Sequence, residues 1–172
     1  MPLPVAHGAV GASIVALVRA KDSVRHDWKM LLVGAALAIS PDLDFFFLWE
    51  LHLRGWHRGF THSIAMAVVV TALLFALLGR RRVRDVIAYG LAFLSHGLLD
   101  FATTKNAGGV ELLWPFSTAR FKLGVIEFIE LPAGYSLSEI IKYSLIEILV
   151  FVPVLLLVLL VREYAFPKIR SA

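Results

Sequence analysis

The sequence predicts an all-α integral membrane protein, a helical bundle of about five transmembrane or half-spanning helices. Of its 172 residues 59% are hydrophobic and only 17% are charged, whereas a typical soluble domain carries about 25% charged residues. The mean hydropathy is +0.77, and the apolar residues fall into long segments separated by short polar or basic loops. No linker composition or internal repeat divides the chain, so we expect one membrane-embedded domain over residues 1–172.

The first segment, residues 5–18, is apolar but rich in alanine and glycine. Small residues favour close helix packing over contact with lipid. At 1.5 Å per residue this helix reaches about 21 Å, less than the roughly 30 Å hydrocarbon core of a bilayer. We therefore expect a half-spanning helix, followed by a polar loop over residues 19–29.

The second segment is predicted to be helical over residues 30–39 and then to break. Pro41 disfavours helix at the residue before it and can open a new turn. Asp42 and Asp44 therefore lie at a helix break inside apolar sequence. The aromatic run at 45–49 that follows is typical of a membrane interface.

Segments three and four are predicted as helices over residues 61–78 and 86–101. Thr61 is a candidate N-cap of the third helix, and Gly79 is a candidate stop signal at its end. Four arginines stand between the two helices at residues 80–84. Arginine in so short a loop is a signal of membrane topology.

A long region without a spanning helix, residues 102–138, is expected to form an outer cap or re-entrant region, because proline and glycine interrupt it. The last helix, residues 137–161, carries the strongest transmembrane signal. Glu147 inside this helix is expected to pair with Lys142 or with a cation at the outer face.

The distribution of basic residues predicts the orientation of the bundle. Five segments place the 19–29 loop, the 80–84 loop and the C-terminal tail on one side, with 11 of the 17 lysines and arginines. The positive-inside rule makes that side cytoplasmic and puts the N-terminus outside. We expect a multi-pass protein of the inner (cytoplasmic) membrane, in which the basic residues reflect topology and no nucleic acid is bound.

This topology brings the candidate ligand residues to the outer, extracytoplasmic face. Ionisable groups in apolar surroundings are costly unless they pair or coordinate a cation. His96 and Asp100 stand at i and i+4 on one helix face, and the neighbouring Asp42 and Asp44 need a cation or a raised pKa to coexist. The predicted metal ligands are His7, Asp42, Asp44, His57, His62, His96 and Asp100.

Each of these features has a purely structural explanation when it is taken alone. His96 and Asp100 could form a hydrogen-bonded pair on a helix surface. Asp42 and Asp44 could form an Asx-type turn at the end of a helix, and His7 could be incidental. Their convergence on one membrane face favours the metal site over a structural network.

Nitrogen and oxygen ligands in a chain without cysteine favour zinc, with manganese or iron as alternatives and one to three ions in the site. Such a site supports attack of a metal-activated water on an ester, with Asp42 or Asp44 as the catalytic base or a bridging ligand. Arg58, Arg120 and Lys122 lie on the same side and could neutralise a substrate phosphate. They could equally be solvated loop charges or contacts to lipid headgroups.

Four stretches carry a resemblance to a known family: Ser-Pro-Asp-Leu-Asp (40–44), His-Arg-Gly-Phe-Thr-His-Ser (57–63), Ser-His-Gly-Leu-Leu-Asp (95–100) and Leu-Trp-Pro-Phe-Ser (113–117). In order and spacing they resemble the signatures of the YdjM-like family of inner-membrane, metal-dependent hydrolases. The resemblance covers roughly residues 1–125. It implies a core distantly similar to zinc-dependent phospholipase C and the S1/P1 nucleases, with the seven predicted ligands binding metal or acting in catalysis. One departure is that those soluble enzymes use their N-terminal residue as a ligand, whereas His7 follows six residues.

We therefore predict a membrane-bound metal-dependent hydrolase that cleaves a phosphoester of a phospholipid or lipid-linked substrate at the extracytoplasmic face. The expected partners are this lipid substrate and the bilayer itself. An alternative is a non-catalytic, metal-stabilised membrane regulator or scaffold protein. A metal or proton transporter ranks last, because the inner halves of segments two to four carry almost no polar residues.

Overall fold

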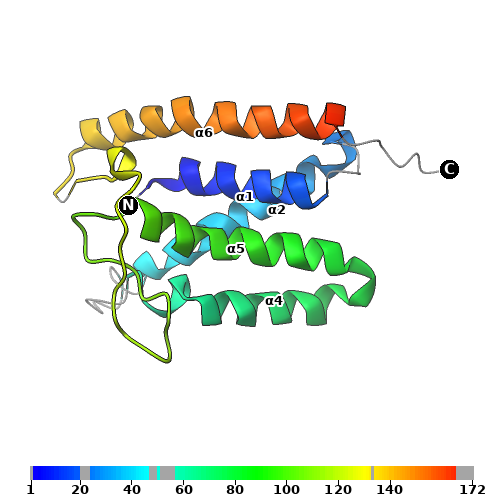
Figure 1. The fold of residues 1–172 in the computed structure, drawn as a ribbon, viewed down its shortest axis with the longest axis horizontal. Coiled ribbons are helices and arrows are strands. Elements are labelled where there is room, and N and C mark those ends of the chain that lie inside the picture. The colour runs from blue at the N-terminus through cyan, green and yellow to red at the C-terminus, as the bar shows by residue number, and fades with distance from the viewer. Residues whose placement is uncertain (1, 20–23, 47–49, 51–56, 133, 166–172) are drawn as a thin grey trace.

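Five α-helices in the described part of the chain form one antiparallel bundle in the computed structural model (Figure 1). The structure describes residues 2–19, 24–46, 50, 57–132 and 134–165, without the side chains of residues 24–27. The α-helices are α1 (Pro4–Val18), α2 (Val24–Ile39), α4 (Ile64–Leu78), α5 (Val83–Thr103) and α6 (Leu137–Ala165). The 3₁₀ turns are η1 (Ser40–Asp44), η2 (Phe60–His62), η3 (Arg80–Arg82) and η4 (Glu127–Ile129). No strand occurs among these described residues, so the prediction of an all-α protein is confirmed.

At three boundaries the helices extend further into charged sequence than predicted. α2 begins at Val24, so part of the polar stretch predicted as a loop over residues 19–29 is helical. α5 begins earlier than predicted, at Val83, and α6 ends later, at Ala165. Arginine, lysine and glutamate are good helix formers. A helix can therefore continue into charged sequence after its apolar run has ended.

The N-cap of α4 is Ser63 and not the predicted Thr61. The Ser63 side chain accepts a hydrogen bond from the Met66 backbone N–H at 3.0 Å, while Thr61 lies inside η2. The predicted stop at Gly79 is confirmed, because this residue caps α4 with a φ of 74°, which glycine adopts without steric cost.

Small residues let α1 lie close to α2, as the sequence predicts. A Cβ atom on Gly11 would lie only 2.6 Å from the carbonyl oxygen of Gly34. Alanines fill much of the buried core, and large apolar side chains point outward instead: Leu77 and Leu149 are 81% and 74% exposed. This distribution fits helices that pack in lipid, where small residues set the helix contacts.

Two segments of the described structure, Arg80–Thr103 and Leu137–Ala165, are long and apolar enough to cross a membrane. With 29 residues α6 is about 44 Å long, more than the roughly 30 Å of a hydrocarbon core. α1 and α4 have 15 residues each and reach about 22 Å. The bundle therefore combines long and short apolar helices.

One end of the bundle gathers the starts of α1, α4 and α6 and the ends of α2 and α5 (Figure 1). Pro41 ends α2 here, as predicted, and η1 carries Asp42 and Asp44. The arginines of η3 lie at the opposite end. Of the predicted aromatic run at 45–49, residues 47–49 lie outside the described residues.

The predicted cap covers the same end of the bundle. α5 runs to Thr103, so the cap begins later than residue 102. It contains η4 and an isolated antiparallel bridge between Val110 and Phe121. The cap thus brings irregular, polar backbone over helix ends that carry histidine and aspartate.

Candidate metal centre

The structure brings all seven predicted ligand residues together at the capped end of the bundle. His7 comes from α1, Asp42 and Asp44 from η1, His57 from the loop before η2, His62 from η2, and His96 and Asp100 from the end of α5. Each has a nitrogen or oxygen within 3.5 Å of another member. The seven side chains form one continuous cluster.

His96 presents Nε2 to the centre of the cluster, because its other ring nitrogen is occupied. Nδ1 lies 2.7 Å from the carbonyl oxygen of Ala38, and a carbonyl can only accept, so Nδ1 carries the proton. In the neutral ring Nε2 then has a lone pair. This use of the second nitrogen is the arrangement that orients metal-bound histidines in proteins.

His62 is held in the same tautomer by Thr61. The Thr61 hydroxyl donates to Asp44 Oδ2 at 2.8 Å, so its oxygen accepts the hydrogen bond from His62 Nδ1 at 2.9 Å. His62 Nε2 therefore also has a lone pair. It lies 2.9 Å from His96 Nε2, and two facing lone pairs at that distance repel unless a cation lies beside them or one of the nitrogens takes up a proton.

Asp42 adds a third acceptor at the same point. Its Oδ1 lies 3.3 Å from His96 Nε2 and 3.6 Å from His62 Nε2. This oxygen is buried and has no hydrogen-bond partner among the described residues. Ligand atoms of Asp42, His57 and His62 also lie within 4.8 Å of one another. Acceptors that converge without a donor are typical of a cation site.

A second group of ligand atoms lies deeper in the bundle. His7, His96 and Asp100 are buried and offer atoms within 4.8 Å of one another. The His7 ring stacks on His96 with 3.8 Å between centroids, and its Nε2 lies 3.5 Å from Asp100 Oδ1. In the described part of the chain, the two ring nitrogens of His7 form no hydrogen bond. The two carboxylate oxygens of Asp100 form none either. Buried polar atoms without hydrogen bonds are rare, so this group fits a neighbouring cation, which is either a metal ion or the Arg58 guanidinium, whose Nε lies 3.0 Å from Asp100 Oδ2.

Asp44 differs from Asp42 in its surroundings. Its Oδ1 lies 2.8 Å from His57 Nδ1, and its Oδ2 accepts from the Arg58 N–H at 3.1 Å and from the Thr61 hydroxyl. Both oxygens are therefore engaged by the protein, and the residue is 1% exposed. Asp44 matches the carboxylates that orient histidine ligands from behind. Because both of its oxygens are already engaged by protein groups, Asp44 is not free to act as a general base.

The electrostatics of Asp42 and His62 suit metal binding. Burial alone would raise the pKa of Asp42, but positive charge on the adjacent His62 and His96 rings, when they are protonated, outweighs burial and holds that pKa well below its usual range. Burial lowers the pKa of His62 despite the nearby Asp42 carboxylate. An anionic aspartate and a neutral histidine are the forms that bind a divalent cation.

Arg58 lies inside the cluster, although the sequence placed it in a loop. Its side chain is only 5% exposed, and its Nε lies 3.0 Å from Asp100 Oδ2. The alternative of a solvated loop charge is therefore wrong for Arg58. No sequence pattern signals this burial, because Arg58 is flanked by His57 and Gly59.

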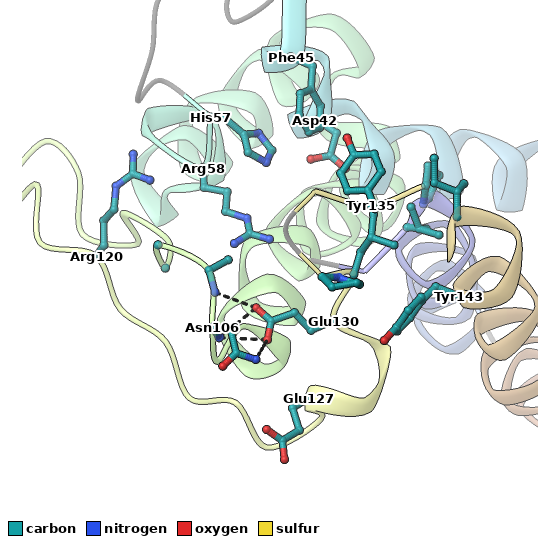
Figure 2. A pocket seen from close by; sticks show the side chains of 18 residues that line it. Asp42, Phe45, His57, Arg58, Asn106, Arg120, Glu127, Glu130, Tyr135 and Tyr143 are labelled. Atoms are coloured by element: carbon teal, nitrogen blue, oxygen red, sulfur yellow. Dashed lines mark hydrogen bonds between the residues drawn. The ribbon is translucent and has the colours of Figure 1, made fainter. Parts of the chain in front are cut away.

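A pocket of about 690 Å³ opens onto the cluster (Figure 2). Asp42, His57 and Arg58 lie in its wall, and Figure 2 shows the Arg58 guanidinium directed into the pocket between Asp42 and the cap. The opposite wall comes from the cap and from the starts of α1 and α6, with Tyr135 and Tyr143 among its residues. The pocket thus connects the candidate ligands to the outside.

The other two predicted substrate residues have different positions. Arg120 lines the pocket, and its Nη2 lies 3.0 Å from Glu111 Oε1. Lys122 does not line the pocket: its Nζ donates to the Lys105 carbonyl at 2.8 Å. Contact with a pocket-bound substrate therefore stays a prediction for Arg120 and has no support from the position of Lys122.

Two glutamates shape the site in ways that the sequence did not predict. Glu147 does not pair with Lys142 in the structure; its carboxylate accepts hydrogen bonds from the backbone N–H groups of Leu3 and Ala6, the latter at 2.9 Å. It thereby caps the start of α1, which carries His7. No side-chain pattern signals a carboxylate whose partners are backbone groups far away in the chain.

Glu130, which the sequence did not single out, holds the cap wall of the pocket. Its carboxylate accepts from the backbone N–H groups of Lys105, Asn106 and Ala107 at 3.0–3.2 Å (Figure 2). Burial opposes ionisation of Glu130, but these N–H groups outweigh burial and hold its pKa below the usual value. Glu130 therefore fixes the loop that faces Asp42 across the pocket.

Comparisons with known proteins point to a membrane protein family. A family model described as YdjM inner membrane protein matches residues 1–168. The chain is also 41% identical over 101 residues to a protein named inner membrane protein YbcI, from Escherichia coli (strain K12). That match covers 54% of this chain and 57% of the relative, so it spans little more than half the length of either protein. No solved structure matches the chain.

Proposed function

The chain belongs to the YdjM inner membrane protein family, and we propose that it is a membrane-bound hydrolase that uses a divalent metal ion. The proposed substrate is a phosphoester of a phospholipid or of a lipid-linked phosphate. The observation that supports this most directly is the pair of Nε2 atoms of His62 and His96, 2.9 Å apart beside the Asp42 carboxylate. In the neutral rings these nitrogens are acceptors that face each other without a donor, and the adjacent Asp42 lines an open pocket.

Zinc fits the donor set best. Imidazole and carboxylate ligands without thiolate suit zinc, with manganese or iron as alternatives. A divalent ion held here would supply Lewis acidity that lowers the pKa of a bound water to near 7. The ligands that we propose are His7, Asp42, His57, His62, His96 and Asp100.

The remaining residues take roles that follow from their contacts. Asp42 is the proposed proton acceptor, because it is the one cluster carboxylate that lines the pocket. Asp44 orients the centre through His57 and Thr61. Arg58 faces the pocket with a permanent positive charge, which suits a substrate phosphate.

The pocket walls support an amphiphilic substrate. One wall is apolar and aromatic, with Leu3 and Pro4 at the start of α1 and Ile140 and Tyr143 at the start of α6. α6 is largely exposed along its length and is long enough to cross a bilayer. A lipid could therefore place its chains against α6 and its phosphate near Arg58.

We place this site at the extracytoplasmic side of a multi-pass protein. The exposed arginines of η3 lie at the end of the bundle opposite the pocket. Clustered arginines favour the cytoplasmic side, so the opposite end faces outward. A cysteine-accessibility experiment in intact cells tests this, because Gly108→Cys in the cap should react with a membrane-impermeant reagent and Arg81→Cys should not.

The function is tested by metal analysis and a substrate panel on the detergent-purified protein. We expect bound zinc and hydrolysis of at least one phospholipid or lipid pyrophosphate. His96→Ala and Asp42→Asn should lose both metal and turnover, whereas Arg81→Ala, at the opposite end, should retain both. Unchanged metal content in the two site variants would refute the centre.

The non-catalytic scaffold gives a different pattern in the same experiment. It predicts bound metal without hydrolysis, and loss of the folded state rather than of turnover when a ligand is removed. The pocket that exposes Asp42 and His57 favours the hydrolase, because a purely structural metal site needs no open position.

A further inference from the structure

Arg58 is held in an unusual backbone conformation. Its φ is +60°, a left-handed value that is uncommon for residues other than glycine and marks local strain. Two hydrogen bonds fix the strained residue: its N–H donates to Asp44 Oδ2 at 3.1 Å, and its carbonyl accepts from the Glu111 N–H at 3.0 Å. Strain of this kind persists where the surroundings determine one conformation, so the placement of this side chain is built in.

We propose that Arg58 is a fixed cation of the metal centre, which takes the place that a second metal ion would otherwise occupy beside Asp100. The centre therefore binds one divalent ion per chain. This inference rests on the proposed function in requiring a metal at the site. It goes further by assigning the number of ions and the role of the guanidinium.

The charges of the cluster support one ion. Asp42, Asp44 and Asp100 contribute three negative charges, and Arg58 contributes one positive charge, while neutral histidines add none. Two negative charges remain, which one divalent ion cancels. A second divalent ion would leave two uncompensated positive charges in a buried site, and buried charge is costly unless it is paired.

The other charged side chains around the pocket do not change this balance. Arg120 is paired with Glu111, and Lys105 with Glu127. Glu130 is held by backbone N–H groups of the cap, and Glu147 by the backbone N–H groups of Leu3 and Ala6. Among the described charges near the ligands, Arg58 is therefore the one that is both buried and in contact with a ligand carboxylate.

The guanidinium also suits this place chemically. It stays charged at any physiological pH and offers five N–H donors in a plane. Its Nε faces Asp100, and the group extends into the pocket (Figure 2). One residue can thus balance a ligand carboxylate and bind a phosphoryl oxygen, two tasks that metal ions share in sites with two metals.

The test is metal stoichiometry in the full-length protein. Detergent-purified protein is loaded with excess zinc, desalted and analysed for metal per chain by mass spectrometry. We expect one zinc per chain in the wild type. Two or three per chain would overturn the inference while leaving the proposed function standing, whereas no bound metal would overturn both.

Substitution of Arg58 separates its charge from its shape. Arg58→Lys should keep one zinc per chain, because the positive charge remains. Arg58→Met should raise the ratio from one toward two at the same zinc concentration, because Asp100 then lacks its cation; a ratio that stays at one contradicts the inference. Arg84→Met, the same chemical change at the opposite end of the bundle, should leave the ratio at one. If Arg58→Met does not fold, the wild-type ratio still decides.

Discussion

Removal of the Glu147 carboxylate should destabilise the first helix and loosen the metal centre. Glu147 is fully buried in α6, and its two oxygens accept the N–H groups of Leu3 and Ala6 at the start of α1. The next residue, His7, is a proposed ligand. The carboxylate therefore links the peripheral helix to the centre through the backbone of α1.

The magnitude follows from the groups that lose a partner. In Glu147→Ala two buried N–H groups lose this acceptor, at roughly 1–3 kcal/mol each. We expect a total of roughly 2–6 kcal/mol for the two N–H groups, and about half of it for Glu147→Gln, which keeps one acceptor oxygen.

Thermal unfolding in detergent, followed by circular dichroism, measures this loss. A change of 1 kcal/mol shifts Tm by about 2–4 °C in a chain of this size, so Glu147→Ala should lower Tm by roughly 4–24 °C. Zinc affinity, measured by competition with a chelator, should fall in the same variant because His7 is no longer held. Lys142→Gln is the matched control on α6, and it should change neither property.

Two results would refute this reasoning. One is a Tm for Glu147→Ala that stays within about 2 °C of the wild type, which would mean that the N–H groups find other partners. The other is an equal loss of stability in Lys142→Gln, which would support the ion pair between Glu147 and Lys142 that the sequence predicts.

Three further predictions concern the groups around the centre. Thr61→Val removes the hydroxyl that accepts from His62 Nδ1 and should weaken zinc binding about 10–100-fold. Thr61→Ser keeps a hydroxyl and should bind zinc with the wild-type affinity. Equal zinc affinity in the two variants would contradict the tautomer assigned to His62. Gly97→Ala places a Cβ 2.2 Å from the His62 carbonyl oxygen and should cost about 1–3 kcal/mol, whereas Gly108→Ala, with its nearest atom at 3.8 Å, should be tolerated in the same unfolding assay. Glu130→Gln should lower Tm at pH 7; because the folded-state pKa of Glu130 is depressed, its stabilisation is present above the ordinary pKa of about 4.3 and is lost as pH falls. The Tm difference from wild type should therefore shrink below about pH 4, and a constant difference would argue against a charge effect.

The sequence predicted the helices and the grouping of the ligands well, for identifiable reasons. Apolar runs long enough for a helix are unambiguous in a chain this hydrophobic, and Pro41 marks the break that carries Asp42. Counting basic residues oriented the segments, and orientation alone brought residues from α1, η1, η2 and α5 to one end. The structure places these residues in contact.

The roles within the cluster could not be predicted, because they depend on backbone groups. Asp42 and Asp44 are equivalent in the sequence, yet Asp44 is engaged by the Arg58 N–H and Asp42 is not. That contact requires the left-handed conformation of Arg58, which its residue type does not signal. Glu147 was misassigned for the same reason, since a charged neighbour is visible in a sequence and a distant N–H group is not.

The contact between Glu147 and α1 has a consequence for biosynthesis. A ribosome delivers α1 first and α6 last, so the proposed metal ligands, which end at Asp100, are all synthesised before the carboxylate that caps α1 exists. Until α6 has been synthesised, the first turn of α1 lacks this acceptor. Completion of the proposed centre would therefore depend on α6, and a nascent chain arrested before α6 would carry every proposed ligand without the carboxylate that caps α1.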